Sequence, residues 1–246
     1  MGTASTMGSL AEALGMVLPG TAGTPAPDSR LLQAAHESGI RIVEMIEEDL
    51  KPSDIMTAAA FTNAIVTLGA IGGSSNAVVH LLAIAGRLGV KLTLDDFDRI
   101  GSRIPLLVNL QPAGEFLMED LFRAGGLAAV LNEVKRYLDP TAISVTGKPF
   151  VDSLAGAEIY DSSVIKTHDS PLQPEAGIAV LRGNIAPDGA VIKPAAASKN
   201  LLVHTGKAVI FESIEDFHAR IDDPDLDVDE NSVLVLRGCG PKGYPG

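Results

Sequence analysis

Two adjacent glycines, Gly72 and Gly73, interrupt a long apolar region and constrain the fold of this chain more than any other feature. They stand within the stretch Gly69–Leu82, which reads GAIGGSSNAVVHLL. Glycine is poorly suited to a helix interior, so one helix is predicted to end here. Small polar residues then precede a second apolar run, which is typical of a helix N-terminus. The residues at this predicted helix start are Ser74, Ser75 and Asn76.

The predicted helix start has two interpretations. A helix N-terminus presents unpaired N–H groups and about half a positive charge, so it can hold an anionic or hydroxyl-rich ligand. The same residues also form an ordinary helix cap, with Ser or Asn as the hydrogen-bond acceptor. His80 shares a helical face with Asn76, and a hydrogen-bonded structural histidine is the simplest explanation for it. The residues leave both interpretations of the helix start open.

Composition and charge exclude several classes of protein. The 246 residues, 46% hydrophobic and 20% charged, are enough for one substantial core or two small ones. A net charge of −12 argues against a nucleic-acid partner, which needs a basic surface. No apolar run reaches the roughly 18 residues of a membrane span, and no signal-peptide pattern is present. Because a single cysteine, Cys239, fits a reducing compartment, we expect a cytoplasmic protein.

The first 160 residues are predicted to be mainly helical, because apolar residues recur there at helical spacing. Long helices are expected at residues 3–18, 28–49, 57–68, 76–88, 115–124 and 127–138, and short ones at 94–101 and 149–155. Residues 104–110 (IPLLVNL) are brief, apolar and strand-like. The helix over 28–49 is expected to bury one apolar face, formed by Leu31, Leu32, Ala35, Ile42, Val43 and Ile46.

The pattern changes after residue 160. Residues 161–176 are polar and contain Pro171 and Pro174, as a linker does. Short β-branched runs separated by glycine turns follow, and one helix opened by Ser213 interrupts them. Strands are expected at residues 178–181, 190–192, 201–204, 208–211 and 233–236. The chain is therefore predicted to have a helical part followed by a strand-rich part.

No complete catalytic or metal-binding motif is present. The acidic run Asp222–Glu230 fails as a calcium loop, because glycine and glutamate are absent from the sixth and twelfth positions. The five histidines have no metal-ligand spacing with each other or with Cys239. The loop Gly238–Gly246 (GCGPKGYPG) is either a tight connection between strands or an anion site that Lys242 can reach.

Six stretches, in order along the chain, resemble the dihydroxy-acid and sugar-acid dehydratase family. They are Met1–Met7 (MGTASTM), Glu12–Gly20 (EALGMVLPG), Ala70–Ala85 (AIGGSSNAVVHLLAIA), Pro105–Gly114 (PLLVNLQPAG), Arg182–Lys193 (RGNIAPDGAVIK) and Arg237–Gly246 (RGCGPKGYPG). The QPAG and RGCGPKGYPG forms are more similar to the sugar-acid (pentonate) branch than to the branched-chain amino-acid branch.

The resemblance implies a hydro-lyase that removes water from a 2,3-dihydroxy (aldonic) acid to give a 2-keto-3-deoxy acid. In this family an iron–sulfur cluster, either 2Fe-2S or 4Fe-4S, acts as Lewis acid on the 3-hydroxyl, and Mg²⁺ binds the carboxylate end of the substrate. Family members form homo-oligomers. The implied fold class is α/β. Residues 1–160 are expected to be the helix-rich part of an α/β N-terminal domain, residues 161–176 a linker, and residues 177–246 the first part of a β-barrel-like C-terminal domain.

The chain also departs from the family pattern. The cluster cysteines, the Mg²⁺ ligands and the catalytic serine of the family all match positions outside these 246 residues, and Cys239 matches a position that is not a ligand. Neither cofactor is expected to bind this chain alone, because one thiolate cannot hold a cluster. We expect a central fragment that is inactive alone, with no catalytic or metal-ligating residue of its own.

The resemblance nevertheless places some residues of this chain next to the active site of the family. The residues expected beside the cluster are Gly2, Thr3 and Ser5. Those expected beside the substrate and Mg²⁺ are Ser74, Ser75, Asn76, Gly240, Lys242 and Gly243. Two alternatives stay open: a non-catalytic module that binds a small acid, and one part of a split dehydratase.

Overall fold

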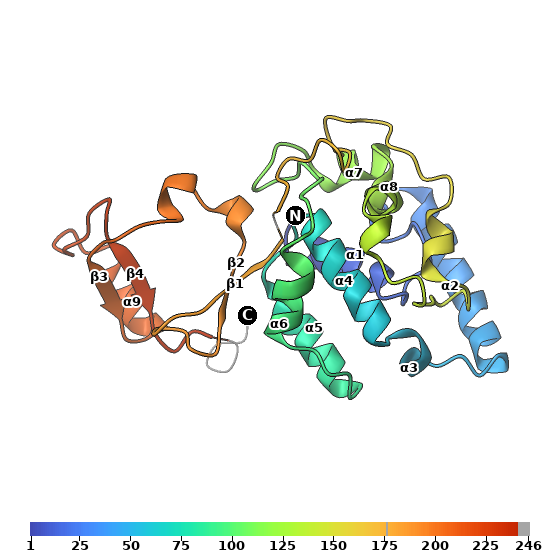
Figure 1. Ribbon diagram of the computed structural model, residues 1–246, viewed down its shortest axis with the longest axis horizontal. Coiled ribbons are helices and arrows are strands. Elements are labelled where there is room, and N and C mark those ends of the chain that lie inside the picture. The colour runs from blue at the N-terminus through green and yellow to red at the C-terminus, as the bar shows by residue number, and fades with distance from the viewer. Residues whose placement is uncertain (176, 241–246) are drawn as a thin grey trace. The chain divides into compact units, whose positions relative to one another are not determined.

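The computed structural model describes residues 1–175 and 177–240, which divide into two compact units (Figure 1). The first unit is Met1–Ala196 and the second begins at Ala197. Within the described residues the chain is a mixture of helices and small sheets. The domain boundary predicted at residues 161–176 concerns the domains of the family and stays a prediction.

The first unit is mainly helical. Its α-helices are α1 (Thr3–Ala13), α2 (Ser29–Glu47), α3 (Pro52–Ile55), α4 (Ala58–Ala70), α5 (Asn76–Arg87), α6 (Leu94–Asp96), α7 (Met118–Arg123) and α8 (Gly126–Glu133). A π-helical turn, η1 (Phe97–Gly101), continues α6. Short 3₁₀ turns are η2 (Lys135–Tyr137), η3 (Phe150–Leu154) and η4 (Pro194–Ala196). The strands β1 (Ala179–Leu181) and β2 (Ala190–Ile192) pair antiparallel, with Ala179 opposite Ile192.

The second unit is small. It contains the 3₁₀ turn η5 (Lys199–Leu201), the strands β3 (Ala208–Phe211) and β4 (Val233–Leu236), and between them helix α9 (Ile214–Arg220). β3 and β4 pair in parallel, with Ala208 opposite Val233. Among residues 177–240 the strands form these two-stranded sheets and close no barrel.

Helix α4 is the centre of the core of the first unit. Its sequence, AAAFTNAIVTLGA, is mostly apolar and carries no charge, and every residue of the helix from Asn63 to Ala70 is buried. It packs against α1, α5, α8 and η1 (Figure 1). The fully buried Asn63 is satisfied by residue 139, because its Oδ1 accepts the N–H of Asp139 at 2.7 Å and its Nδ2 donates to the Asp139 carbonyl at 3.2 Å. A buried amide in such a core is tolerated only when it is paired in this way.

Several predicted helices are confirmed together with their local causes. Asp28 caps α2, and its side chain accepts the N–H of Arg30 at 2.9 Å. Ser213 caps α9 in the same way, accepting the N–H of Asp216 at 3.2 Å. Helix α5 begins at Asn76, as the small polar residues predict. These signals are correct because each depends only on hydrogen bonds within a few residues.

Other predictions were wrong. The helix expected over 3–18 ends at Ala13, because Gly15 takes a left-handed backbone (φ +81°) that breaks the helix. The strand expected at 201–204 does not form, and its first residue, Leu201, ends the 3₁₀ turn η5 instead. The segment 104–110 is extended but makes only isolated bridges, for example between Leu106 and Gln173.

The buried face predicted for α2 was also wrong. Only Ala34 and Met45 of this helix are buried. The residues that were expected to be covered are exposed, with Leu31 at 39%, Leu32 at 76%, Ile42 at 54%, Val43 at 55% and Ile46 at 74%, and Ala35 is exposed as well. The helix contacts the rest of its unit through the opposite side, where Arg41 donates from Nε to the carbonyl of Val145.

The carboxylate of Glu12 connects α1 to the loop that follows it. Because this group is buried, we expect the stability of the protein to depend on pH. The carboxylate is buried and accepts the N–H groups of Gly20 at 2.8 Å and Ala22 at 2.9 Å. Burial raises the pKa of Glu12, although these hydrogen bonds act in the opposite direction. Between pH 4.5 and the raised pKa, the folded chain holds a proton that the unfolded chain has released, so the free energy of unfolding decreases as pH rises through this window.

We expect Glu12→Gln to remove this part of the pH dependence, because the amide does not titrate. Urea midpoints measured between pH 4 and 8 test this expectation. Glu37→Gln, at an exposed position of α2, serves as the control and should keep the slope of the unchanged protein. An identical slope in the Glu12→Gln protein would contradict the assignment.

Among residues 1–175 and 177–240, no helix combines the length and the apolar character that crossing a membrane requires.

Candidate functional site

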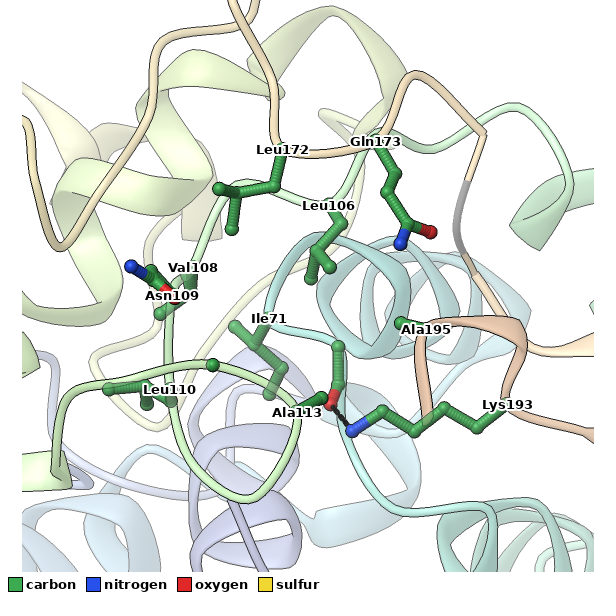
Figure 2. A pocket seen from close by; sticks show the side chains of 12 residues that line it. Ile71, Leu106, Val108, Asn109, Leu110, Ala113, Leu172, Gln173, Lys193 and Ala195 are labelled. Carbon is green, nitrogen blue, oxygen red and sulfur yellow. Dashed lines mark hydrogen bonds between the residues drawn. The ribbon is translucent and has the colours of Figure 1, made fainter. Parts of the chain in front are cut away.

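A cavity of about 210 Å³ lies in the first unit, where segments far apart in the sequence meet (Figure 2). The turn between α4 and α5 contributes one wall, the extended segment 106–114 a second, and the region after β2 a third. Its lining residues are Ile71, Gly72, Leu106, Val108, Asn109, Leu110, Ala113, Gly114, Leu172, Gln173, Lys193 and Ala195. Most of these residues are apolar, but polar atoms supply the larger part of the surface that the cavity exposes.

Lys193 supplies a cation to this cavity. It directly follows β2, and its Nζ donates a hydrogen bond to the carbonyl of Gly72, 121 positions away, as the dashed line in Figure 2 shows. The side chain is half-buried, and this burial lowers the pKa of the Lys193 ammonium. Within the described part of the chain no carboxylate raises that pKa again. The Nζ donors that Gly72 does not use can therefore bind an anion.

The starts of α1 and α5 come together next to this cavity. The Oγ1 of Thr3 lies 3.2 Å from the Oγ of Ser74 and accepts a hydrogen bond from Nδ2 of Asn76 at 2.9 Å. The N–H of Ser74 donates to Oγ1 of Thr6 at 3.0 Å. Neither helix has a side-chain bond from its N-cap residue, but at the start of α5 the N–H of Asn76 donates to Oγ of Ser74 at 3.3 Å. Two helix dipoles thus direct positive potential to one region.

The two glycines before α5 are required by packing. A Cβ atom on Gly72, whose φ is +57°, would lie 2.5 Å from Cδ1 of Leu106. A Cβ on Gly73 would lie 2.6 Å from Cδ1 of Leu68 and 2.7 Å from Cγ2 of Thr6. Only glycine allows α1, α4 and the segment 106–114 to approach this turn so closely.

The structure brings together some of the residues predicted from the sequence. Gly2 is the N-cap of α1, Thr3 joins Ser74 and Asn76, and Ser75 is the N-cap of α5. Ser5 lies in the first turn of α1, where its carbonyl accepts the hydroxyl of Ser9 at 3.0 Å. Gly240 is an exposed residue of the second unit, and Lys242 and Gly243 lie outside the described residues. The roles of these residues beside a cluster or a substrate stay predictions.

The sequence interpretation missed Lys193. The available signal was a lysine at the end of a β-branched run, inside a stretch already recognised as similar to the family. That signal is weak without the fold, because nothing near Lys193 in sequence shows that Gly72 is its partner.

The described residues do not fit the metal groups that the resemblance implies. Among residues 1–175 and 177–240, no three His, Cys, Asp or Glu side chains are grouped so that they could hold a metal ion. The chain contains one cysteine, Cys239, whereas an iron–sulfur cluster is held by several thiolates. No chemical step through a cluster or Mg²⁺ follows from these residues.

Comparison with known families gives two matches that together cover most of the chain. Residues 1–153 match the model of the dihydroxy-acid/6-phosphogluconate dehydratase N-terminal domain, and residues 163–246 match the model of the C-terminal domain of the same family.

Individual relatives agree with this result. The L-arabinonate dehydratase of Rhizobium leguminosarum bv. trifolii (strain WSM2304) is 54% identical over 238 residues, 96% of this chain and 41% of that protein. The D-xylonate dehydratase of Caulobacter vibrioides is 43% identical over 259 residues, 100% of this chain and 43% of that protein. The dihydroxy-acid dehydratase of Acetivibrio thermocellus is 43% identical over 248 residues, 100% of this chain and 44% of that protein.

The chain thus spans between 41% and 44% of the length of these curated relatives. The matched residues include the starts of α1 and α5 and the cavity that contains Lys193. The chain belongs to the dihydroxy-acid/6-phosphogluconate dehydratase family.

Proposed function

We propose that this chain forms the central part of a sugar-acid dehydratase, a hydro-lyase that converts a 2,3-dihydroxy aldonic acid into a 2-keto-3-deoxy acid. The observation that carries the proposal is the cavity where Lys193 meets the turn before α5, in a chain that matches both domains of the dehydratase family. A half-buried ammonium in a cavity of about 210 Å³ suits a small hydroxylated acid better than a large ligand.

The residues of this chain bind and orient the substrate. The Lys193 ammonium pairs with the carboxylate, because a charge-assisted hydrogen bond in a partly desolvated cavity is stronger than the same bond in water. The apolar side chains Leu106 and Val108 pack against the carbon chain of the acid and exclude water. Asn109 and Gln173 supply polar side chains to the pocket, and Thr3, Ser74 and Asn76 lie next to it at the starts of α1 and α5.

The cofactors belong to the whole protein. An iron–sulfur cluster and Mg²⁺, where the whole protein holds them, would supply Lewis-acid chemistry, and no described residue of this chain is assigned to bind them. Their ligands are proposed to come from residues outside this stretch, because the chain has one cysteine and the described residues have no cluster of ligating side chains. The chain alone is therefore inactive. In the whole protein, residues 177–246 form part of a β-barrel-like domain, and the enzyme is a cytoplasmic homo-oligomer.

The sugar-acid branch is favoured over the branched-chain amino-acid branch. The arabinonate dehydratase is 54% identical to this chain, whereas the dihydroxy-acid dehydratase is 43% identical. A pentonate is therefore the first substrate to test.

A chimeric enzyme tests the proposal. The 246 residues replace the matching stretch of the L-arabinonate dehydratase of R. leguminosarum, and formation of 2-keto-3-deoxy acid from a set of aldonates is measured. We expect dehydratase activity from the chimera and none from the 246 residues alone. A chimera that folds and carries its metals but dehydrates no aldonate would contradict the proposal. Keto-acid formation by the 246 residues alone would contradict the statement that this chain is inactive by itself.

A further inference from the structure

Gln173 lines the same cavity as Lys193, and the remaining polar side chain of the lining is that of Asn109. We propose that Gln173 determines which acids the enzyme accepts. In this assignment, which rests on the proposed function, Lys193 binds the carboxylate of the substrate and the Gln173 amide binds a hydroxyl group beyond C3. Gln173 would then select polyhydroxylated acids over 2,3-dihydroxy acids that carry an alkyl tail.

The backbone of Gln173 is held in place by the extended segment opposite it. The carbonyl of Gln173 accepts the N–H of Leu106 at 2.9 Å, and the N–H of Leu172 donates to the Leu106 carbonyl at 2.9 Å. Further along the same two segments, the fully buried Ile165 forms a second antiparallel bridge, with Val108. These contacts fix the point from which the Gln173 side chain enters the cavity, and none of them uses its amide.

The Gln173 side chain extends into the cavity on the side of Lys193, as Figure 2 shows. It is partly buried, and among residues 1–175 and 177–240 the hydrogen bonds of Gln173 are those of its backbone. A primary amide has two N–H donors and a carbonyl acceptor. A ligand hydroxyl, which both donates and accepts, can therefore bind this amide in either direction.

Asn109 differs from Gln173 because the fold already uses its amide. Its Oδ1 accepts the N–H of Glu115 at 3.1 Å, and its Nδ2 donates to the carbonyl of Ser163 at 3.5 Å. A Cβ atom on Gly114 would clash with this Oδ1, so the loop closes tightly around the Asn109 side chain. Asn109 therefore shapes the wall of the cavity, whereas the amide of Gln173 is available to a ligand.

The chemistry of the amide indicates which part of a substrate it recognises. An uncharged amide suits the uncharged hydroxyl groups of a carbon chain, and a pentonate has such groups at C4 and C5. An acid with an alkyl tail offers none, so it would separate the Gln173 amide from water and leave it without a hydrogen-bond partner. Leaving a desolvated polar group unpaired is costly. A site that binds a substrate hydroxyl thus rejects the analogue that lacks it.

A matched pair of acids tests the assignment in the chimeric dehydratase. The first is a pentonate that the chimera dehydrates. The second is the 2,3-dihydroxypentanoate with the same configuration at C2 and C3, which lacks only the hydroxyls at C4 and C5. We expect the parent chimera to prefer the pentonate in kcat/KM by at least about tenfold. Gln173→Met keeps a side chain of similar length without the amide, and it should reduce this preference by roughly tenfold.

The ratio of the two kcat/KM values separates recognition from a structural role. A change in packing would alter kcat/KM for both acids by the same factor, whereas the loss of a hydroxyl contact lowers the value for the pentonate alone. Gln173→Glu keeps the shape of the side chain and an acceptor for a hydroxyl, so it should retain more of the preference than Gln173→Met. Gln33→Met makes the same change at an exposed position of α2 and should keep the parent preference.

The outcomes distinguish this assignment from the proposed function. A folded, metal-loaded chimera that dehydrates neither acid would overturn both. An active chimera in which Gln173→Met changes kcat/KM equally for the two acids, or for neither, would overturn the role of Gln173 and leave the proposed function intact. Equal use of both acids by the parent chimera would do the same. Circular dichroism confirms that each variant is folded.

Discussion

Replacing Lys193 by methionine in the chimeric dehydratase is expected to lower kcat/KM for an aldonate by roughly 10- to 100-fold. Hydrogen bonds to charged groups contribute about 1.5–3 kcal/mol, and each 1.36 kcal/mol corresponds to a factor of ten. The methionine side chain has a similar length and keeps the packing against the cavity but has no charge. Because the substrate carboxylate is unchanged by the reaction, most of the loss should be in KM. Steady-state kinetics with a pentonate as substrate measures kcat and KM separately.

The pH dependence separates binding by Lys193 from a structural role. Since burial lowers the pKa of Lys193, the ammonium form is lost at a lower pH than for an exposed lysine. The KM of the unchanged chimera should therefore rise as pH increases through the lowered pKa, and Lys193→Met should remove this rise. Lys199→Met, at an exposed position six residues on, is the control and should have the kinetics of the parent. An unchanged KM in the Lys193→Met chimera would show that Lys193 does not bind the substrate.

Replacing Gly15 by alanine is expected to lower the free energy of unfolding by about 3 kcal/mol or more. Two effects combine. Gly15 has a φ of +81°, a left-handed conformation that costs a residue with a Cβ about 1–2 kcal/mol. The added Cβ would also lie 2.5 Å from the carbonyl oxygen of Ile143 and 2.9 Å from Cγ2 of Ile55, and overpacking of this kind costs about 1–3 kcal/mol. Because domains are stable by only about 5–15 kcal/mol, this loss is a large fraction of the total.

Gly20→Ala is a matched control. Its φ is +84°, almost the same as at Gly15, but a Cβ there would meet nothing within 4 Å. We expect Gly20→Ala to cost only the conformational part, about 1–2 kcal/mol. Urea unfolding followed by circular dichroism measures both variants. If the two variants were equally destabilised, the close contact of Gly15 with Ile143 would be refuted.

Much of the helical part was predictable from the sequence because its causes are local. The Asp28 and Ser213 caps are each formed by a side chain and an N–H two or three residues on. The helix over 57–68 was likewise predicted from its apolar run, whereas its place at the centre of the core became evident only from the fold. The end of α1 was misjudged, since Gly15 turns the chain before the proline that the sequence interpretation used as its stop signal.

The candidate site was only half predictable. The Ser74–Asn76 helix start and the Thr3 region were found from their residues and from the family resemblance, and the structure joins them by hydrogen bonds. Lys193 was missed, because its acceptor, the Gly72 carbonyl, is 121 positions away. Because the cavity is formed by segments that are far apart in the sequence, no single segment contains a sequence motif that reveals it.

By itself, the sequence determined where most helices begin, that a glycine turn separates α4 from α5, and which family the chain resembles. Those features depend on capping side chains, backbone freedom and short motifs, all of which act over a few residues. Only the tertiary structure decided that the apolar face of α2 stays open, and that Gly72 and Gly73 are needed because Leu106 and Thr6 pack against them. The physical reason is that burial requires a covering surface, and that surface comes from parts of the chain distant in sequence.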